Sequence, residues 1–171
     1  MDRPDLDHLF SATYEELRRL ARSVRSDHPA ASLSPTTIVN EAYLKLAASL
    51  RIEPESRTHF KRLAARAMRQ VLVEAARRRG ANRRGGDWHR ITFDAALQVE
   101  TSSFEEILLL DMALEELARL SPRQAAMMEC RFFGGLSTAE TAEALGVSEA
   151  TLNRDWRAAR AWLSVELARR R

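Results

Sequence analysis

The sequence has little of several residue types, and each shortage narrows the class of protein. It has one cysteine in 171 residues, so no disulfide can form within the chain and nothing indicates an oxidising compartment. Six glycines and five prolines leave few breaks in a chain dominated by alanine, leucine, arginine and glutamate, which favours helices over sheets. The chain has no run of about 18 apolar residues and no apolar signal core near residue 1, so we expect a cytoplasmic protein without a membrane segment.

Signatures of catalytic and metal sites are also missing from the sequence. The four histidines, His8, His28, His59 and His89, are scattered without the spacing of metal ligands. We find no glycine-rich phosphate loop and no nucleophile beside a base motif. We therefore expect no metal, no cofactor and no enzymatic activity. Cys130 lies within an apolar helical pattern and is interpreted as a small core residue.

Positive charge is concentrated in the middle of the chain. Residues 57–103 contain eleven Lys or Arg against four Asp or Glu, whereas the segments on both sides are slightly acidic. The net charge of the whole chain is +3. A local surplus of this kind is typical of a surface that binds nucleic acid or another polyanion.

Apolar periodicity predicts an all-α protein made of two small helical domains. We expect helices over about 5–24, from Ser34-Pro35 onward, over 57–79, over 104–120, from Ser121-Pro122 to 133, over 137–145 and over 148–168. The domains are predicted at 1–80 and 104–171. A flexible basic linker, rich in glycine and arginine, is predicted at 81–103.

The stretch GVSEATLNRDWRAARAWL, residues 146–163, is typical of the second half of a helix-turn-helix. Gly146 stands where the turn needs a positive φ angle, Ala142 is small where two helices cross, and Ser148 can cap the second helix. An αα-corner without any DNA-binding role has the same turn signals. These residues alone therefore leave both interpretations open.

The last predicted helix has two distinct faces. Leu152, Trp156, Ala159 and Leu163 recur at helical spacing and are expected to face the core. Asp155 is interpreted as a residue that orients an arginine. The residues predicted to contact DNA are Ser148, Glu149, Ala150, Thr151, Asn153, Arg154, Arg157 and Arg160. The alternative is that the arginines only line a solvated face.

The helix predicted at 57–79 interleaves basic residues with an apolar stripe. The side chains expected to follow a phosphate backbone are Lys61, Arg62, Arg66, Arg69, Arg77, Arg78 and Arg79. A membrane surface or an acidic protein would also suit this helix when it is considered alone.

With both motifs in view, residues from about 6 to 167 resemble the small two-domain extracytoplasmic-function (ECF) sigma factors, a class of the sigma-70 family of bacterial RNA polymerase. TTIVNEAYLKLA resembles the family's core-polymerase-binding segment, and HFKRLAARAMRQVLVEAARRR resembles its promoter-melting and minus-ten-reading helix. SPRQAAMMECRFFGGLSTAETAEALGVSEATLNRDW is similar to its minus-thirty-five-reading domain. The resemblance implies a protein that binds core RNA polymerase, contacts two elements of promoter DNA and helps to open the duplex.

The resemblance also implies roles for individual residues. The last helix would read the upstream, minus-thirty-five element, and a flipped base would be captured in the connection 48–58. The group for minus-ten recognition and melting is Lys61, Arg62, Arg66, Arg69, Gln70, Glu74 and Arg77. Gln70 stands where the family often has Asn, and Glu74 where it often has Asp. The group for core polymerase binding is Thr37, Ile38, Val39, Glu41, Tyr43 and Leu44.

One departure from the family pattern concerns the polymerase-binding segment. The family usually has several acidic residues there, whereas SPTTIVNE has Glu41 as its one carboxylate. Phosphorylation of Thr36 or Thr37 near the helix N-terminus would add a charge of about −1.5 to −2. Our hypothesis is therefore that a Ser/Thr kinase gates activity in place of an anti-sigma factor. The alternative is that the threonines cap the helix and that binding rests on Glu41 and apolar contacts.

A second function class stays open. A stand-alone helix-turn-helix regulator would bind an operator with its C-terminal domain and a partner with its first domain. The sequence has no evident dimerisation seam or ligand pocket, and the basic helix would have no role in such a protein. These observations favour the sigma factor interpretation.

Overall fold

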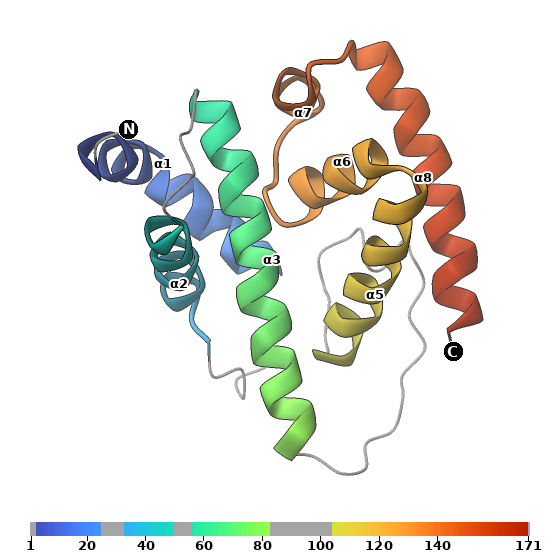
Figure 1. Cartoon of the computed structure of the whole chain (residues 1–171), viewed down its shortest axis with the longest axis horizontal. Coiled ribbons are helices and arrows are strands. Elements are labelled where there is room, and N and C mark those ends of the chain that lie inside the picture. Colours follow the sequence, from blue (N-terminus) through green and yellow to red (C-terminus); the bar gives the residue numbers. More distant parts are fainter. Residues whose placement is uncertain (1–2, 25–32, 50–55, 83–103, 171) are drawn as a thin grey trace.

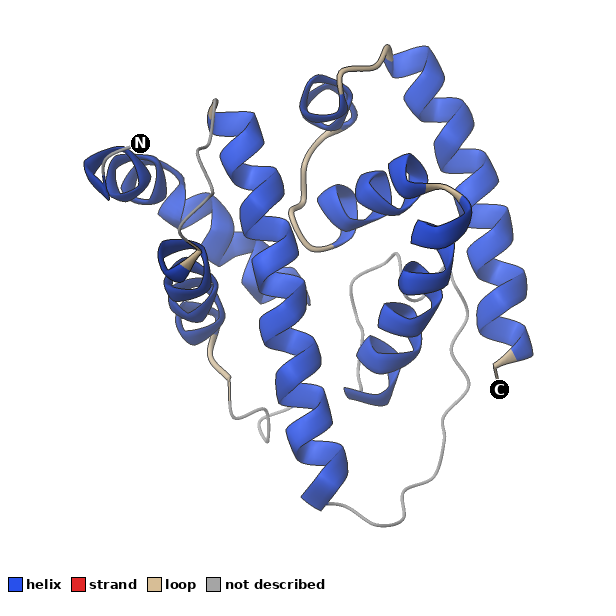
Figure 2. Ribbon diagram, viewed as in Figure 1, coloured by secondary structure: helices blue, strands red, loops and turns tan. Residues whose placement is uncertain are grey.

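The computed structural model describes residues 3–24, 33–49, 56–82 and 104–170 (Figure 1). The described residues form helices and no strand (Figure 2), so the prediction of an all-α protein is confirmed. The helices are α1 (Arg3–Val24), α2 (Pro35–Ala48), α3 (Arg57–Asn82), α5 (Phe104–Leu120), α6 (Pro122–Phe132), α7 (Thr138–Leu145) and α8 (Glu149–Arg169). The predicted linker begins inside α3, which continues through Asn82, and the rest of it lies outside the described residues. Most of the connection 48–58 also lies outside the described residues.

Local capping signals account for most helix starts. Ser34 and Ser148 each accept a hydrogen bond from the backbone N–H three residues on, at 3.0 and 3.2 Å. Ser137 and Glu140 form a reciprocal capping box, with bonds of 3.2 and 2.8 Å. Ser121 occupies the expected position before Pro122, but its side chain makes no capping hydrogen bond. The start of α6 therefore depends on the fixed φ angle of Pro122 rather than on a side-chain cap.

α3 is the central element of the described fold (Figure 1). It packs on α1 and α2 on one side and on α5, α6 and α7 on the other, and α8 packs on α5, α6 and α7. The buried apolar residues of the N-terminal helices (α1 to α3) and of the C-terminal helices (α5 to α8) form one continuous cluster. Phe60, Met68 and Met128 are fully buried members of it. Burial of apolar surface therefore holds the C-terminal helices against α3.

The segment after α6 approaches α3 closely at Gly134. A Cβ atom at this position would lie 2.7 Å from the Cβ of Ala65 and 2.6 Å from the backbone oxygen of Cys130. No side chain fits at such distances, so glycine allows the close contact. Cys130 itself is fully buried, which confirms its interpretation as a core residue, and burial raises the pKa of its thiol to about 12.

The helix-turn-helix has the turn that the sequence predicts. Gly146 follows α7 with a φ angle of 64°, in the left-handed region. Its N–H donates to the carbonyl of Glu143 at 3.1 Å, and the N–H of Val147 donates to the carbonyl of Ala142 at 3.0 Å. These bonds satisfy carbonyl groups at the end of α7. Ala142 and Leu152 are buried where the two helices meet.

We expect Gly146→Ala to lower the free energy of unfolding by about 1 kcal/mol, because alanine is strained at a positive φ angle. A Cβ atom would meet nothing within 4 Å here, so the backbone conformation alone sets the cost. Gly146→Asn should cost less, since asparagine tolerates the left-handed region. Urea denaturation of the three proteins checks this order. Equal losses for alanine and asparagine would contradict it.

Candidate nucleic-acid interface

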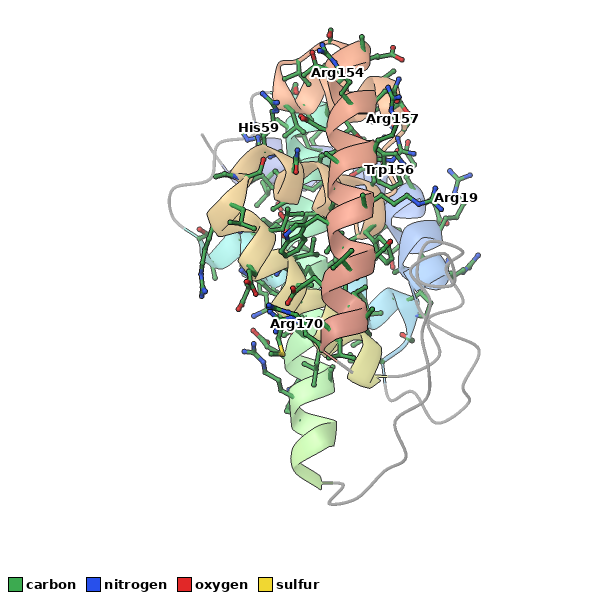
Figure 3. All side chains as sticks on the ribbon, turned by 90° about the vertical axis from the view of Figure 1, so that its right-hand side faces the viewer. Arg19, His59, Arg154, Trp156, Arg157 and Arg170 are labelled. Atoms are coloured by element: carbon green, nitrogen blue, oxygen red, sulfur yellow. The ribbon has the colours of Figure 1, made fainter. Side chains whose placement is uncertain are left out.

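α8 presents a basic face to solvent. Arg154 and Arg157 are exposed near the N-terminal end of the helix (Figure 3), while Leu152 and Leu163 on the opposite face are buried. Thr151 is half-buried. The other residues predicted to contact the upstream element are all exposed, namely Ser148, Glu149, Ala150, Asn153, Arg154, Arg157 and Arg160. The structure therefore brings the predicted residues together on one accessible surface.

Trp156 lies at the edge of the core rather than inside it. Its side chain is half-buried against the apolar cluster, whereas Ala159 is fully buried as expected. The guanidinium carbon of Arg131 lies 4.7 Å from the centroid of the Trp156 ring, in cation–π geometry. Arg131 also donates a hydrogen bond of 2.7 Å to the hydroxyl of Thr138. The indole thus positions a cation of α6 beside α7.

Asp155 orients an arginine, as the sequence predicts, and that arginine is Arg123 of α6. The Nε and Nη2 atoms of Arg123 donate to the two carboxylate oxygens of Asp155 at 2.7 and 3.2 Å. The hydrogen bond from Arg123 lowers the pKa of Asp155, against the opposing effect of burial. About half of the Arg123 side chain stays exposed. The sequence does not identify this arginine, because nothing in the spacing links residues that are 32 positions apart.

The α3 residues that are predicted to bind nucleic acid lie on two faces of the helix. Arg66, Gln70 and Glu74 recur every four residues and are exposed on one face. The carboxylate of Glu74 pairs with Lys45 of α2 at 2.7 Å. The second face lies against the C-terminal helices, and Lys61, Arg62 and Arg69 on it are partly covered.

Arg69 makes the densest set of contacts across this face. Its Nε donates to the Oδ1 atom of Asp111 at 2.8 Å, its Nη2 to the backbone oxygen of Asp111 at 3.1 Å, and its Nη1 to Glu129 at 3.2 Å. Arg77 approaches the second carboxylate oxygen of Asp111 at 3.4 Å. The Asp111 side chain is only 7% exposed. A buried carboxylate of this kind depends on its partners, because an unpaired charge there would be costly.

Lys61 of α3 contacts one helix from each group, α1 among the N-terminal helices and α7 among the C-terminal helices. Its ammonium group lies 2.5 Å from Glu16 of α1 and 2.7 Å from Glu140 of α7. Burial disfavours the charged lysine, but hydrogen bonds to Glu140 and Glu16 outweigh it and raise the pKa of Lys61. The hydrogen bond from Lys61, with that from the Ser137 backbone, lowers the pKa of Glu140 to about 2. Arg62 adds a bond of 3.3 Å to the carbonyl of Ala144, so α7 is held at two points.

The ion pair of Glu140 predicts a pH dependence. A carboxylate whose pKa falls from 4.5 to about 2 on folding stabilises the protein above pH 4.5, and this contribution is lost as the pH falls toward 2. Since a third of the side chain is exposed, we expect a contribution of about 1 kcal/mol after solvent screening. Urea denaturation at about pH 6 and about pH 3 measures the stability difference between wild type and Glu140→Gln. A difference that does not shrink at the lower pH would contradict this assignment.

The predicted polymerase-binding residues of α2 include both buried and exposed side chains. Ile38 and Val39 are buried in the core, whereas Glu41 is exposed and Leu44 is 58% exposed. Tyr43 is half-buried. The ring of Tyr43 packs on Phe10 with centroids 4.3 Å apart, and its hydroxyl donates to Asp7. Glu41 and Leu44 are therefore the members of this group most accessible to a partner.

The threonines at the start of α2 lie beside its cap. Thr36 and Thr37 are half-buried, and the Thr37 hydroxyl lies 2.8 Å from the hydroxyl of Ser34. The first turn of α2 contains no acidic residue.

The described part of the chain has no group of three or more His, Cys, Asp or Glu side chains able to hold a metal ion. None of its helices is long and apolar enough to cross a membrane. In comparison with known proteins, the model of the family described as ECF sigma factor matches residues 2–169. No curated protein and no solved structure matches the chain.

Proposed function

Since the chain belongs to the ECF sigma factor family, we propose that it binds core RNA polymerase and directs the enzyme to promoters by contacting two promoter elements. Membership of the family implies promoter-specific transcription initiation with RNA polymerase, a role in regulation rather than in catalysis. The observation that supports the finer proposal is the presence of exposed arginines on two separate helices, α8 and α3. Two weak DNA-binding surfaces on one chain gain affinity from effective concentration.

We assign the upstream element to the exposed face of α8. The N-terminal residues of a recognition helix reach base edges in the major groove, and arginine can pair with guanine there. Arg154 and Arg157 are exposed on this face, and Arg160 is placed to meet phosphate. Arg123, held by Asp155, extends the basic surface onto the start of α6.

We assign minus-ten recognition and melting to α3. Its exposed face offers Arg66 for phosphates and the amide of Gln70 for the edge of an unstacked base. Glu74 lies further along the same face, with Lys45 beside it. Capture of single-stranded DNA by stacking and hydrogen bonds then favours the open duplex.

We assign core polymerase binding to α2, with Glu41 and Leu44 as its accessible residues. Promoter DNA and polymerase share the bacterial cytoplasm, so we propose that the protein acts there. A pull-down with core polymerase separates this function from that of a stand-alone regulator. A sigma factor is retained by core polymerase without DNA, whereas a regulator that binds only an operator is not.

We further propose that phosphorylation of Thr36 or Thr37 by a Ser/Thr kinase strengthens polymerase binding. Two observations support it: the first turn of α2 has no acidic residue, and a phosphate there would lie at the positive end of the helix dipole. Regulation by an anti-sigma factor is the other possibility that the family offers.

We expect Thr37→Asp to bind core polymerase about tenfold more tightly than the unphosphorylated wild type, and Thr37→Ala to bind no better than it. Binding titrations with core polymerase measure the three affinities. Ser34→Ala is the control for loss of the cap alone, because it removes the hydrogen bonds of Ser34 to the N–H and hydroxyl of Thr37 while both threonines stay in place. Equal affinity for wild type, Thr37→Ala and Thr37→Asp would mean that Glu41 and apolar contacts are sufficient.

A further inference from the structure

Three of the cations that the sequence predicts to contact promoter DNA lie on the covered face of α3 and already have partners. Lys61 contacts Glu140 as well as Glu16 of α1, Arg62 contacts the carbonyl of Ala144, and Arg69 contacts Asp111 and Glu129. All of these acceptors except Glu16 belong to the C-terminal helices. Carboxylate and carbonyl oxygens thus occupy the positions where phosphate oxygens would bind.

The occupied cations are poorly accessible as well as paired. Every nitrogen of the Arg69 guanidinium donates a hydrogen bond across the contact, and the side chain is 15% exposed. The Lys61 side chain is 12% exposed. Asp111 and Glu129 engage three of the five N–H donors of Arg69, so a DNA phosphate can form a two-point contact with this poorly exposed guanidinium only after they move away. The apolar contact of Ala65 with the Gly134 segment would also have to separate.

We propose that this docked arrangement is an autoinhibited state, in which the C-terminal helices cover part of the promoter-melting surface of α3. The contacts of Arg69 with Asp111 and Glu129 form its latch. The inference rests on the proposed function, since it concerns the DNA surface assigned to α3. DNA binds the covered face only in the open fraction of molecules, so docking lowers the apparent affinity by that fraction.

Asp111 is the residue on which the latch depends most. It accepts hydrogen bonds from Arg69 and Arg77, both on α3, and its side chain is the least exposed of the group. Removing its charge leaves Arg69 in a poorly hydrated place with a weaker partner, which disfavours the docked state. The open state is not penalised, because Arg69 is then free to meet water or phosphate.

The test compares Asp111→Asn with Glu115→Gln in the full chain. Both remove one carboxylate from α5, but Glu115 is exposed on that helix. Spin labels at Asn40→Cys on α2 and Ala161→Cys on α8, both exposed, report the separation of the two groups of helices. Cys130 is buried with a raised thiol pKa and stays unlabelled. Fluorescence polarisation with a random-sequence single-stranded DNA oligonucleotide reports phosphate binding.

We expect Asp111→Asn to add a population of longer label distances and to bind the oligonucleotide at least about tenfold more tightly than wild type. Glu115→Gln should keep the wild-type distances and change the affinity by no more than about twofold. Unchanged distances in Asp111→Asn would overturn the proposal. Longer label distances in Asp111→Asn would also overturn it if its affinity for the oligonucleotide stayed equal to that of Glu115→Gln. If Asp111→Asn does not fold, Glu129→Gln weakens the same latch from α6 and carries the test.

The same proteins separate this inference from the proposed function. Retention by core polymerase is measured in parallel for wild type and Asp111→Asn. If neither is retained while opening and tighter DNA binding are observed, the sigma factor assignment fails and the competition between docking and DNA stands. If both are retained but opening does not occur, the sigma factor assignment stands and the latch fails.

Discussion

Replacing Arg154 with alanine is expected to weaken recognition of the upstream promoter element by about ten- to a hundredfold. A bidentate contact between arginine and a guanine edge contributes about 1–3 kcal/mol of base discrimination, and Arg154 is exposed near the N-terminal end of α8, where a recognition helix meets bases. The measurement is initiation in vitro on a promoter selected by the wild type and on the same promoter with its upstream element scrambled. Arg154→Ala should initiate poorly on both templates.

The control for this prediction is Arg119→Ala, which removes an exposed arginine from α5 without touching α8. It should keep the preference for the intact upstream element. An Arg154→Ala protein that distinguishes the two templates as well as the wild type does would show that another residue reads this element.

Replacing Gln70 with alanine is expected to impair duplex opening about tenfold while leaving the first, closed complex nearly unchanged. Gln70 is exposed on the face of α3 assigned to the minus-ten element, and loss of a hydrogen bond from its amide to an unstacked base costs about 0.5–1.5 kcal/mol. Opening is measured by the permanganate reactivity of unpaired thymines, and closed-complex binding by filter retention at low temperature.

Gln70→Asn serves as the matched variant, because it keeps the amide on a shorter side chain. It should open promoters better than Gln70→Ala. A template whose minus-ten region is already unpaired should restore initiation by Gln70→Ala to near the wild-type level. An equal defect on paired and unpaired templates would place Gln70 in polymerase or duplex binding instead of melting.

Local signals in the sequence predicted the helices well. Ser34 and Ser148 cap the helices that follow them, Ser137 begins α7, and Gly146 has the positive φ angle expected of it. Each of these features depends on interactions within a few residues, so the sequence contains the relevant partners side by side. The same Ser-Pro pair begins α2 with a side-chain cap and α6 without one, so the pair alone does not determine whether the serine side chain caps the helix.

The partners of the charged residues could not be predicted in the same way. The basic stripe of α3 identifies cations, but the pattern does not indicate whether phosphates or carboxylates meet them. Arg69 pairs with Asp111, which lies 42 residues later in the sequence, and Lys61 pairs with Glu140, which lies 79 residues later. Pairing over such separations is set by how the helices pack. For the same reason the sequence predicted that Asp155 orients an arginine without identifying Arg123.

If one chain provides two promoter contacts to RNA polymerase, transcription from a library of random templates should reveal both of them. Core polymerase with this protein should enrich templates that share two sequence elements at a nearly constant spacing, with initiation downstream of both. Core polymerase alone should enrich none of them. Failure of the protein to confer any initiation, or enrichment of a single element bound without polymerase, would show that it does not act as a two-element sigma factor.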